Sequence, residues 1–99
     1  MILVETTSAA LTALKPHGWD RRFRYSRGDP RDGSFSNTAV YSRLPLSRSR
    51  PIGNTSFQQW LTTVRIPRVG GIRLMAVHPC IPYCGDDRWS GEHRVLAER

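Results

Sequence analysis

Two single residues and one pair of cysteines have the types and positions that could do chemistry in this sequence. Glu5 and His78 each stand where an apolar run ends, after Ile-Leu-Val and after Leu-Met-Ala-Val respectively. A carboxylate suits a hard cation, and a histidine can exchange protons or bind a metal near neutral pH. Structural roles are also open: Glu5 can favour the positive end of a helix that follows it, and His78, before Pro79, can be a hydrogen-bonded strand end.

The cysteines, Cys80 and Cys84, form a C-x-x-x-C turn. With His78 and His93 they supply ligand types that zinc accepts, but Pro79 and Pro82 stiffen the turn and we expect His93 on a separate helix. A disulfide is the other possibility, provided that the two Cα atoms approach to roughly 4.4 to 6.8 Å. A single pair of cysteines leaves the redox compartment open.

The chain is strongly basic. Its net charge is +7, and fourteen of its fifteen basic residues are Arg. They are scattered rather than clustered, so general basicity explains them better than phosphate recognition does. Arg interleaved with Trp19, Phe23 and Tyr25 nevertheless keeps a non-catalytic, nucleic-acid-binding module as the alternative function.

The elements that must position these side chains begin with a strand at Ile2 to Val4. Thr6, Thr7 or Ser8 is expected to cap a helix over Ala9 to Leu14 that stops before Pro16. Alternation predicts a strand over Arg21 to Tyr25, and turn residues predict a surface loop from Ser26 to Asn37.

The second part of the chain is richer in β-sheet signals. Strands are expected over Thr38 to Ser42, Phe57 to Ile66 and Ile72 to His78, and the last two form a hairpin whose turn is Pro67 to Gly71, of the short kind that Gly-Gly favours. The last strand is nearly continuously apolar and so is expected to be buried on both faces. Ser47 to Asn54 is predicted to be a connector. A final helix from Asp86 or Asp87 to Ala97 should bury Trp89 and turn Glu92 away. The fold class is α/β (α+β), with helices that cover a sheet.

Three patterns occur in order: the strand that ends in Glu5, Tyr41-Ser42-Arg43 followed by Leu44-Pro45-Leu46, and the Val77-His78-Pro79 strand end. In this order they resemble the endonuclease/exonuclease/phosphatase family of DNase-like, metal-dependent phosphoesterases. The resemblance implies a four-layer α/β/β/α sandwich and hydrolysis of phosphoesters at the strand ends. It implies that Glu5 binds Mg²⁺ or Mn²⁺ and that His78 is a catalytic residue that contacts the scissile phosphate. Tyr41, Ser42 and Arg43 are expected to be structural.

The sequence also departs from that family. An Asn-bearing strand before Glu5 is missing, as are an Asp-x-Asn strand and an Asp-His pair after the last helix. We therefore expect residues 1–99 to be a partial domain, inactive alone, whose open sheet edge could pair with another chain. The resemblance implies a phosphoester substrate, with nucleic acids among the classes that the family hydrolyses. No apolar run reaches the roughly 20 residues that span a bilayer, and the compartment stays open between the cytoplasm and a membrane-associated extracytoplasmic site.

Overall fold

The structure is a computed structural model that describes residues 1–28, 30 and 37–99. Most of the surface loop predicted between Ser26 and Asn37 lies outside these residues. Helices and two three-stranded antiparallel sheets make up the described chain, so the mixed α+β class expected from the sequence is confirmed. None of the described helices has the length and apolar character needed to cross a membrane.

The first sheet has the order β1-β3-β2 and is built from β1 (Ile2–Val4), β2 (Tyr25–Arg27) and β3 (Thr38–Ser42). The predicted bounds of β1 and β3 are confirmed. Strand β3 is central and pairs with both neighbours, Leu3 opposite Ala39 and Ser26 opposite Tyr41. Its residues from Thr38 to Tyr41 are buried, as expected for a β-branched and aromatic run at the centre of a sheet.

The helices that follow β1 are α1 (Ser8–Leu14), the 3-10 turn η1 (Lys15–His17) and α2 (Trp19–Arg22). Thr7 caps α1 by accepting a hydrogen bond from the Ala10 N–H at 3.1 Å. The strand predicted over Arg21 to Tyr25 is wrong, because the chain is helical up to Arg22 and extended only from Tyr25. Trp19 and Phe23 are four residues apart, and the Phe23 N–H closes a helical hydrogen bond to the Trp19 carbonyl. Trp19 also packs edge-on against Tyr41, which holds α2 to the first sheet.

The second sheet, β4-β5-β6, contains β4 (Leu46–Pro51), β5 (Trp60–Ile66) and β6 (Gly70–Ala76). The predicted hairpin is confirmed, with Ile66 opposite Gly70 and Trp60 opposite Ala76. The connector predicted over 47–54 is wrong for its first half, which forms β4. That strand lies at the sheet edge, where its polar composition and Pro51 are tolerated.

Strand β6 is not buried on both faces as predicted. It is the other edge strand: Ala76 is buried and Leu74 packs inward, whereas Ile72, Met75 and the following Val77 are exposed. Met75 lies on the face opposite Leu74 and Ala76, whereas Ile72 shares their face but lies nearer the hairpin.

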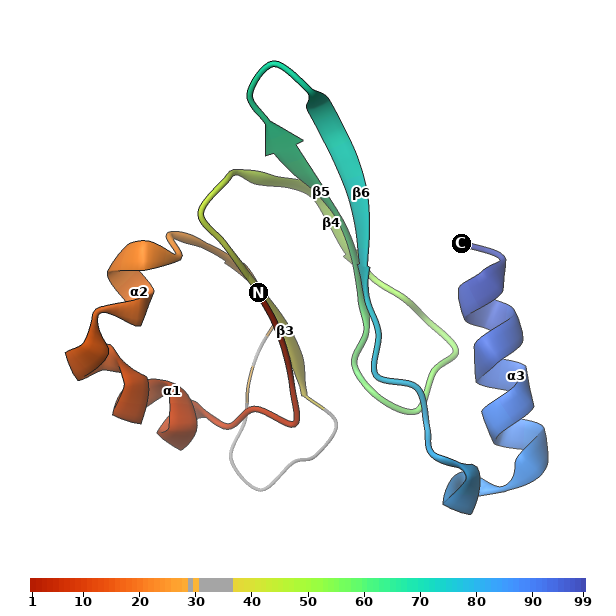
Figure 1. Ribbon diagram of the computed structural model, residues 1–99. Helices are drawn as coiled ribbons and strands as arrows, with labels where there is room; N and C mark the ends of the chain where they lie inside the picture. Colours follow the sequence, from red (N-terminus) through yellow and green to blue (C-terminus); the bar gives the residue numbers. More distant parts are fainter. Residues whose placement is uncertain (29, 31–36) are drawn as a thin grey trace.

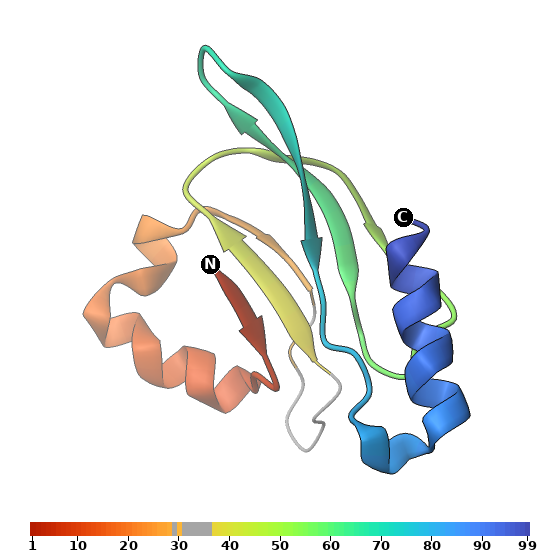
Figure 2. The ribbon, with the colours of Figure 1, turned by 45° about the vertical axis from the view of Figure 1, so that its right-hand side comes forward.

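Two small cores hold the elements together. Val40, Leu46 and Ala76 are buried between the two sheets. On the opposite side of the second sheet, Ile52 and Leu61 pack against Leu96 of α3 (Asp86–Ala97), which follows the 3-10 turn η2 (Pro82–Cys84). Both ribbon views show α1 and α2 outside the first sheet and α3 outside the second (Figures 1 and 2).

Helix α3 has the predicted bounds but not the predicted face. Trp89 is 40% exposed, so its assignment to the core is wrong, and its ring stacks edge-on against His93. Glu92, expected to face away, is buried. Glu92 and Leu96 are four residues apart and so share the face that packs on the sheet.

Candidate functional site

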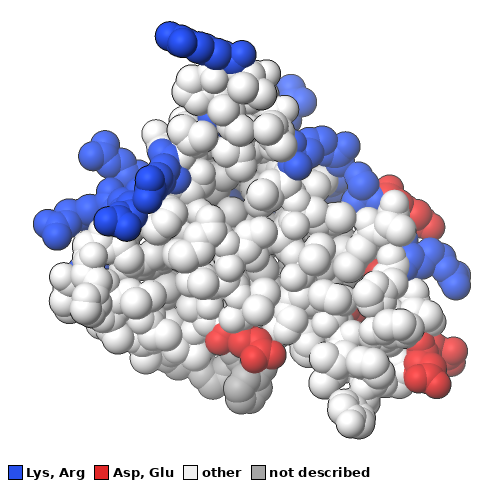
Figure 3. Space-filling view, in the orientation of Figure 1, with Lys and Arg blue, Asp and Glu red and all other residues white. Residues whose placement is uncertain are grey.

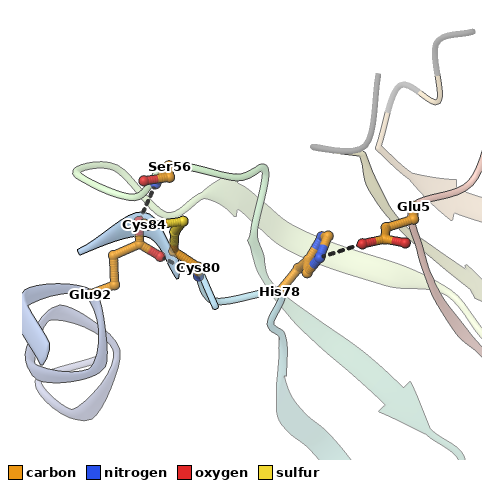
Figure 4. Close-up of a disulfide and its surroundings, with 6 residues drawn as sticks. All are labelled: Glu5, Ser56, His78, Cys80, Cys84 and Glu92. Atoms are coloured by element: carbon orange, nitrogen blue, oxygen red, sulfur yellow. Dashed lines mark hydrogen bonds and ion pairs between the residues drawn. A yellow bond between two sulfur atoms is a disulfide. The ribbon is translucent and has the colours of Figure 1, made fainter. Parts of the chain in front are cut away.

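Glu5 and His78 meet although they follow strands of different sheets. Glu5 comes directly after β1 and His78 comes two residues after β6. The His78 Nε2 lies 3.4 Å from the Glu5 Oε1, with the two side chains directed toward each other (Figure 4). The His78 side chain is 12% exposed and that of Glu5 is 57% exposed, so the pair has one sheltered and one open member. The structure thus brings together the two predicted site residues.

The backbone at Glu5 has an unusual conformation. Its φ is 54°, in the left-handed region that non-glycine residues seldom adopt. Neighbouring hydrogen bonds hold it: the Glu5 N–H donates to the Asn37 carbonyl at 2.8 Å, and the buried Asn37 side chain donates to the Thr6 carbonyl at 3.1 Å. Strained residues persist where the surroundings fix them, and they are common at functional sites.

His78 is held by two residues of the segment that leads into β5. Its backbone N–H donates to the Gln59 Oε1 at 3.3 Å, and its ring lies 4.6 Å from the Phe57 ring. Gln59 is 1% exposed. Within the described ranges the buried Gln59 Nε2 and His78 Nδ1 have no hydrogen-bond partner. A buried polar atom without a partner is costly, and a water or a ligand atom can supply the partner.

A rigid loop continues from His78. Cys80 and Cys84 form a disulfide with their Cα atoms 6.2 Å apart, within the range required above. The Glu92 carboxylate accepts the Cys80 N–H at 2.9 Å and the Ser56 N–H at 2.6 Å (Figure 4). Burial acts to raise the pKa of Glu92, but the hydrogen bonds from Ser56 and Cys80 and the charge of Arg88 outweigh it and lower the pKa.

The zinc interpretation does not fit this arrangement. Both cysteines are consumed by the disulfide, and His93 stacks on Trp89. Among the residues that the structure describes, no group of three or more His, Cys, Asp or Glu side chains could hold a metal ion.

The residues of the Tyr41 segment take the structural roles expected of them. Tyr41 is buried beneath Trp19. The Ser42 hydroxyl accepts the Leu44 N–H at 3.0 Å, and the Arg43 guanidinium lies over the Phe23 ring.

Sequence reasoning missed Phe57, Gln59 and Glu92 as supports of the site. Only Glu92 left a usable signal, its helical spacing from Leu96. Phe57 and Gln59 fall in the strand predicted from Phe57, but β5 begins only at Trp60, and nothing local marks these two residues as partners of a histidine that follows another strand.

Comparisons with known proteins supply no further constraint. No protein-family model matches the chain, and neither a curated protein nor a solved structure is significantly similar to it.

Proposed function

We propose that this chain carries part of a divalent-metal-dependent phosphoesterase site, in which Glu5 binds the cation and His78 contacts the phosphate. The single observation that carries the proposal is the 3.4 Å approach of these two side chains from different sheets. Glu5 and His78 are far apart in the sequence and follow strands of different sheets. Their approach is what is expected if the ends of these strands form one site.

The donor chemistry at Glu5 fits Mg²⁺ or Mn²⁺. Mg²⁺ retains several waters and is bound through one or two carboxylates together with substrate phosphates. Glu5 offers one exposed carboxylate, of which Oε1 faces His78. When bound, such a cation would polarise the phosphate and lower the pKa of a bound water. With a single protein carboxylate, affinity in the absence of substrate should be weak.

His78 is suited to positioning a phosphate. Its ring is fixed by Phe57 and its backbone by Gln59. A fixed donor costs little reorganisation when it bonds to a developing negative charge. Among the described residues the buried Gln59 Nε2 beside this histidine has no hydrogen-bond partner, and a bound water would satisfy it.

Two further features belong to the proposal. The order of helices and sheets in Figures 1 and 2 suits a four-layer sandwich, and exposed apolar side chains at the β1 edge, Ile2 and Val4, suit an additional strand or partner there. By the family resemblance the general base belongs to the Asp-x-Asn and Asp-His motifs, which residues 1–99 do not contain, so in this proposal full hydrolysis needs residues from another segment or chain.

Titration with Mn²⁺ while backbone amide signals are recorded by NMR tests the cation site. Paramagnetic broadening should be strongest at residues next to Glu5 and His78, and Glu5→Gln should remove it there. Glu98→Gln is the matched control, because Glu98 is exposed at the end of α3 and should leave the broadening unchanged. Broadening confined to Asp86 and Asp87, or unaffected by Glu5→Gln, would overturn the proposal.

A further inference from the structure

A second polar surface lies on the outer face of β4-β5-β6, the face that α3 covers only in part. A groove of about 540 Å³ runs across it. Among the residues that the structure describes, four arginines line this groove, Arg48, Arg50, Arg65 and Arg73, together with the hydroxyls of Ser47 and Thr63, and no acidic side chain does. Figure 3 shows Lys and Arg side chains gathered beside the β5–β6 hairpin toward α3.

An irregularity in β4 builds one wall of the groove. Ser47 is opposite Thr63 and Arg50 is opposite Leu61, with a register shift between them. In a regular strand, residues three apart point to opposite faces. The shift lets Ser47 and Arg50 share the groove, while the Ser49 hydroxyl bonds to Thr62 at 2.6 Å. Arg48, in the shifted segment, has a φ of 49°. Bulges of this kind redirect side chains and are common at binding sites.

The strand register sets the spacing of the arginines. Arg50 of β4 is opposite Leu61 of β5, and Arg73 of β6 is opposite Thr63 of β5. Arg65 is on β5 itself, opposite Gly71 of β6. Positions 61, 63 and 65 of β5 follow one another in steps of two residues, or about 7 Å along the strand. Gly71 has no side chain to cover Arg65. The three arginines also lie on three different strands, β4, β6 and β5, so their charges are spread across the sheet as well as along it. Positive charges spread in this way match an extended chain of phosphates better than one compact anion.

We infer that this groove binds the phosphodiester backbone of a single nucleic-acid strand. Guanidinium groups bind phosphate oxygens in a bidentate manner and remain charged. None of the described residues that line the groove is aromatic. We therefore expect no base stacking, and binding that is independent of sequence and strongly dependent on salt. This inference stands apart from the phosphoesterase proposal because the groove contains neither Glu5 nor His78.

Fluorescence anisotropy with a labelled oligothymidylate, recorded from about 50 mM to about 200 mM salt, tests the inference. Arg50→Gln combined with Arg65→Gln should weaken binding about tenfold or more and reduce the salt slope by about 1.4, or roughly 0.7 per lost phosphate contact. The matched control is Arg22→Gln with Arg24→Gln, which removes the same charge from exposed positions near α2. The control variant should lose less than about half as much affinity and salt slope as the groove variant loses.

A folding control completes the experiment. Circular dichroism should show that both double variants are folded, and Arg50→Lys with Arg65→Lys, which keeps the charge, should retain most of the salt slope. Three outcomes would overturn the inference: equal losses in the groove and control variants, a larger loss in the control, or binding to anionic phosphatidylserine vesicles that depends on the groove while the oligothymidylate does not bind.

Discussion

The Glu92 carboxylate on α3 holds both chain segments that enclose His78. It accepts the N–H of Cys80, two residues after His78, and the N–H of Ser56, the residue before Phe57, whose ring packs on the His78 ring. Glu92 is 3% exposed, so these charge-assisted bonds are sheltered from water. The helix therefore does more than cover the sheet, because its one buried carboxylate sets the position of the candidate site.

Replacing this carboxylate should lower stability. Glu92→Gln keeps the shape of the side chain but replaces one carboxylate oxygen with an NH₂ group. That NH₂ group cannot accept the N–H of Ser56 or of Cys80, so at least one hydrogen bond to a charged group is lost. We expect the free energy of unfolding to fall by about 2 kcal/mol. Urea denaturation measures the change. Glu98→Gln, at an exposed position, should stay within about 0.5 kcal/mol of the unmodified chain, and equal effects of the two variants would contradict the role given to Glu92.

Glu92 should also make stability depend on acid pH. Its pKa is lower in the folded chain than in the unfolded chain, because the hydrogen bonds from Ser56 and Cys80 outweigh the effect of burial. Its contribution is therefore present above the unfolded pKa of about 4.3 and is lost as the pH falls through the folded value. Melting temperatures recorded from about pH 6 down to about pH 3 should fall more for the unmodified chain than for Glu92→Gln. Parallel curves would show that Glu92 is not the titrating group.

The Cys80–Cys84 disulfide should add modest stability. It closes a short loop, for which the chain-entropy relation gives about 2 kcal/mol. Cys80→Ser with Cys84→Ser should lower the free energy of unfolding by that order and raise hydrogen exchange at the Cys80 amide. Thiol titration of the unmodified chain under native conditions is the accompanying check, since two free thiols would contradict the disulfide.

The local parts of the fold were predictable, whereas the parts that need distant contacts were not. The β5–β6 hairpin and the start of α3 at Asp86 follow from turn chemistry and helix signals that lie within a few residues of each other. Strand β4 was missed because its edge position, which tolerates Pro51 and charged residues, depends on pairing with β5. Helix α2 was missed because the alternation of Arg with aromatic residues hid the four-residue spacing of Trp19 and Phe23.

The candidate site likewise contains residues that local sequence signals mark and residues that only distant contacts bring to it. Glu5 and His78, which the structure brings to 3.4 Å of each other, are marked in the sequence by apolar runs that each end in an ionisable side chain. Gln59, Phe57 and Glu92 were not predictable, because each acts on the site from another segment of the chain. Burial of Glu92 overrode the general rule that carboxylates stay exposed, and two backbone donors made that burial possible.

Gly28 should tolerate no side chain. Its φ is +114°, and an added Cβ would lie 2.6 Å from the Thr38 carbonyl oxygen and 2.8 Å from the Ala39 Cα. Gly28→Ala should therefore cost about 2 to 4 kcal/mol through backbone strain and overlap with β3. Gly53→Ala is the matched control, because a Cβ added at Gly53 would meet nothing within 4 Å. Thermal denaturation of the two variants compares them directly, and similar melting temperatures would argue against the close approach of Gly28 to β3.

The pairing of Glu5 with His78 is tested most directly by the NMR signals of the His78 imidazole during addition of Mg²⁺ and then of a simple phosphodiester. We expect the two additions together to shift the His78 ring signals, and Glu5→Gln to reduce the shift severalfold. The variant should change stability by no more than about 1 kcal/mol, because Glu5 is largely exposed. Signals of His17, on η1, provide the internal control and should not move. His78 signals that stay unchanged, or that shift equally in Glu5→Gln, would contradict a shared phosphate site.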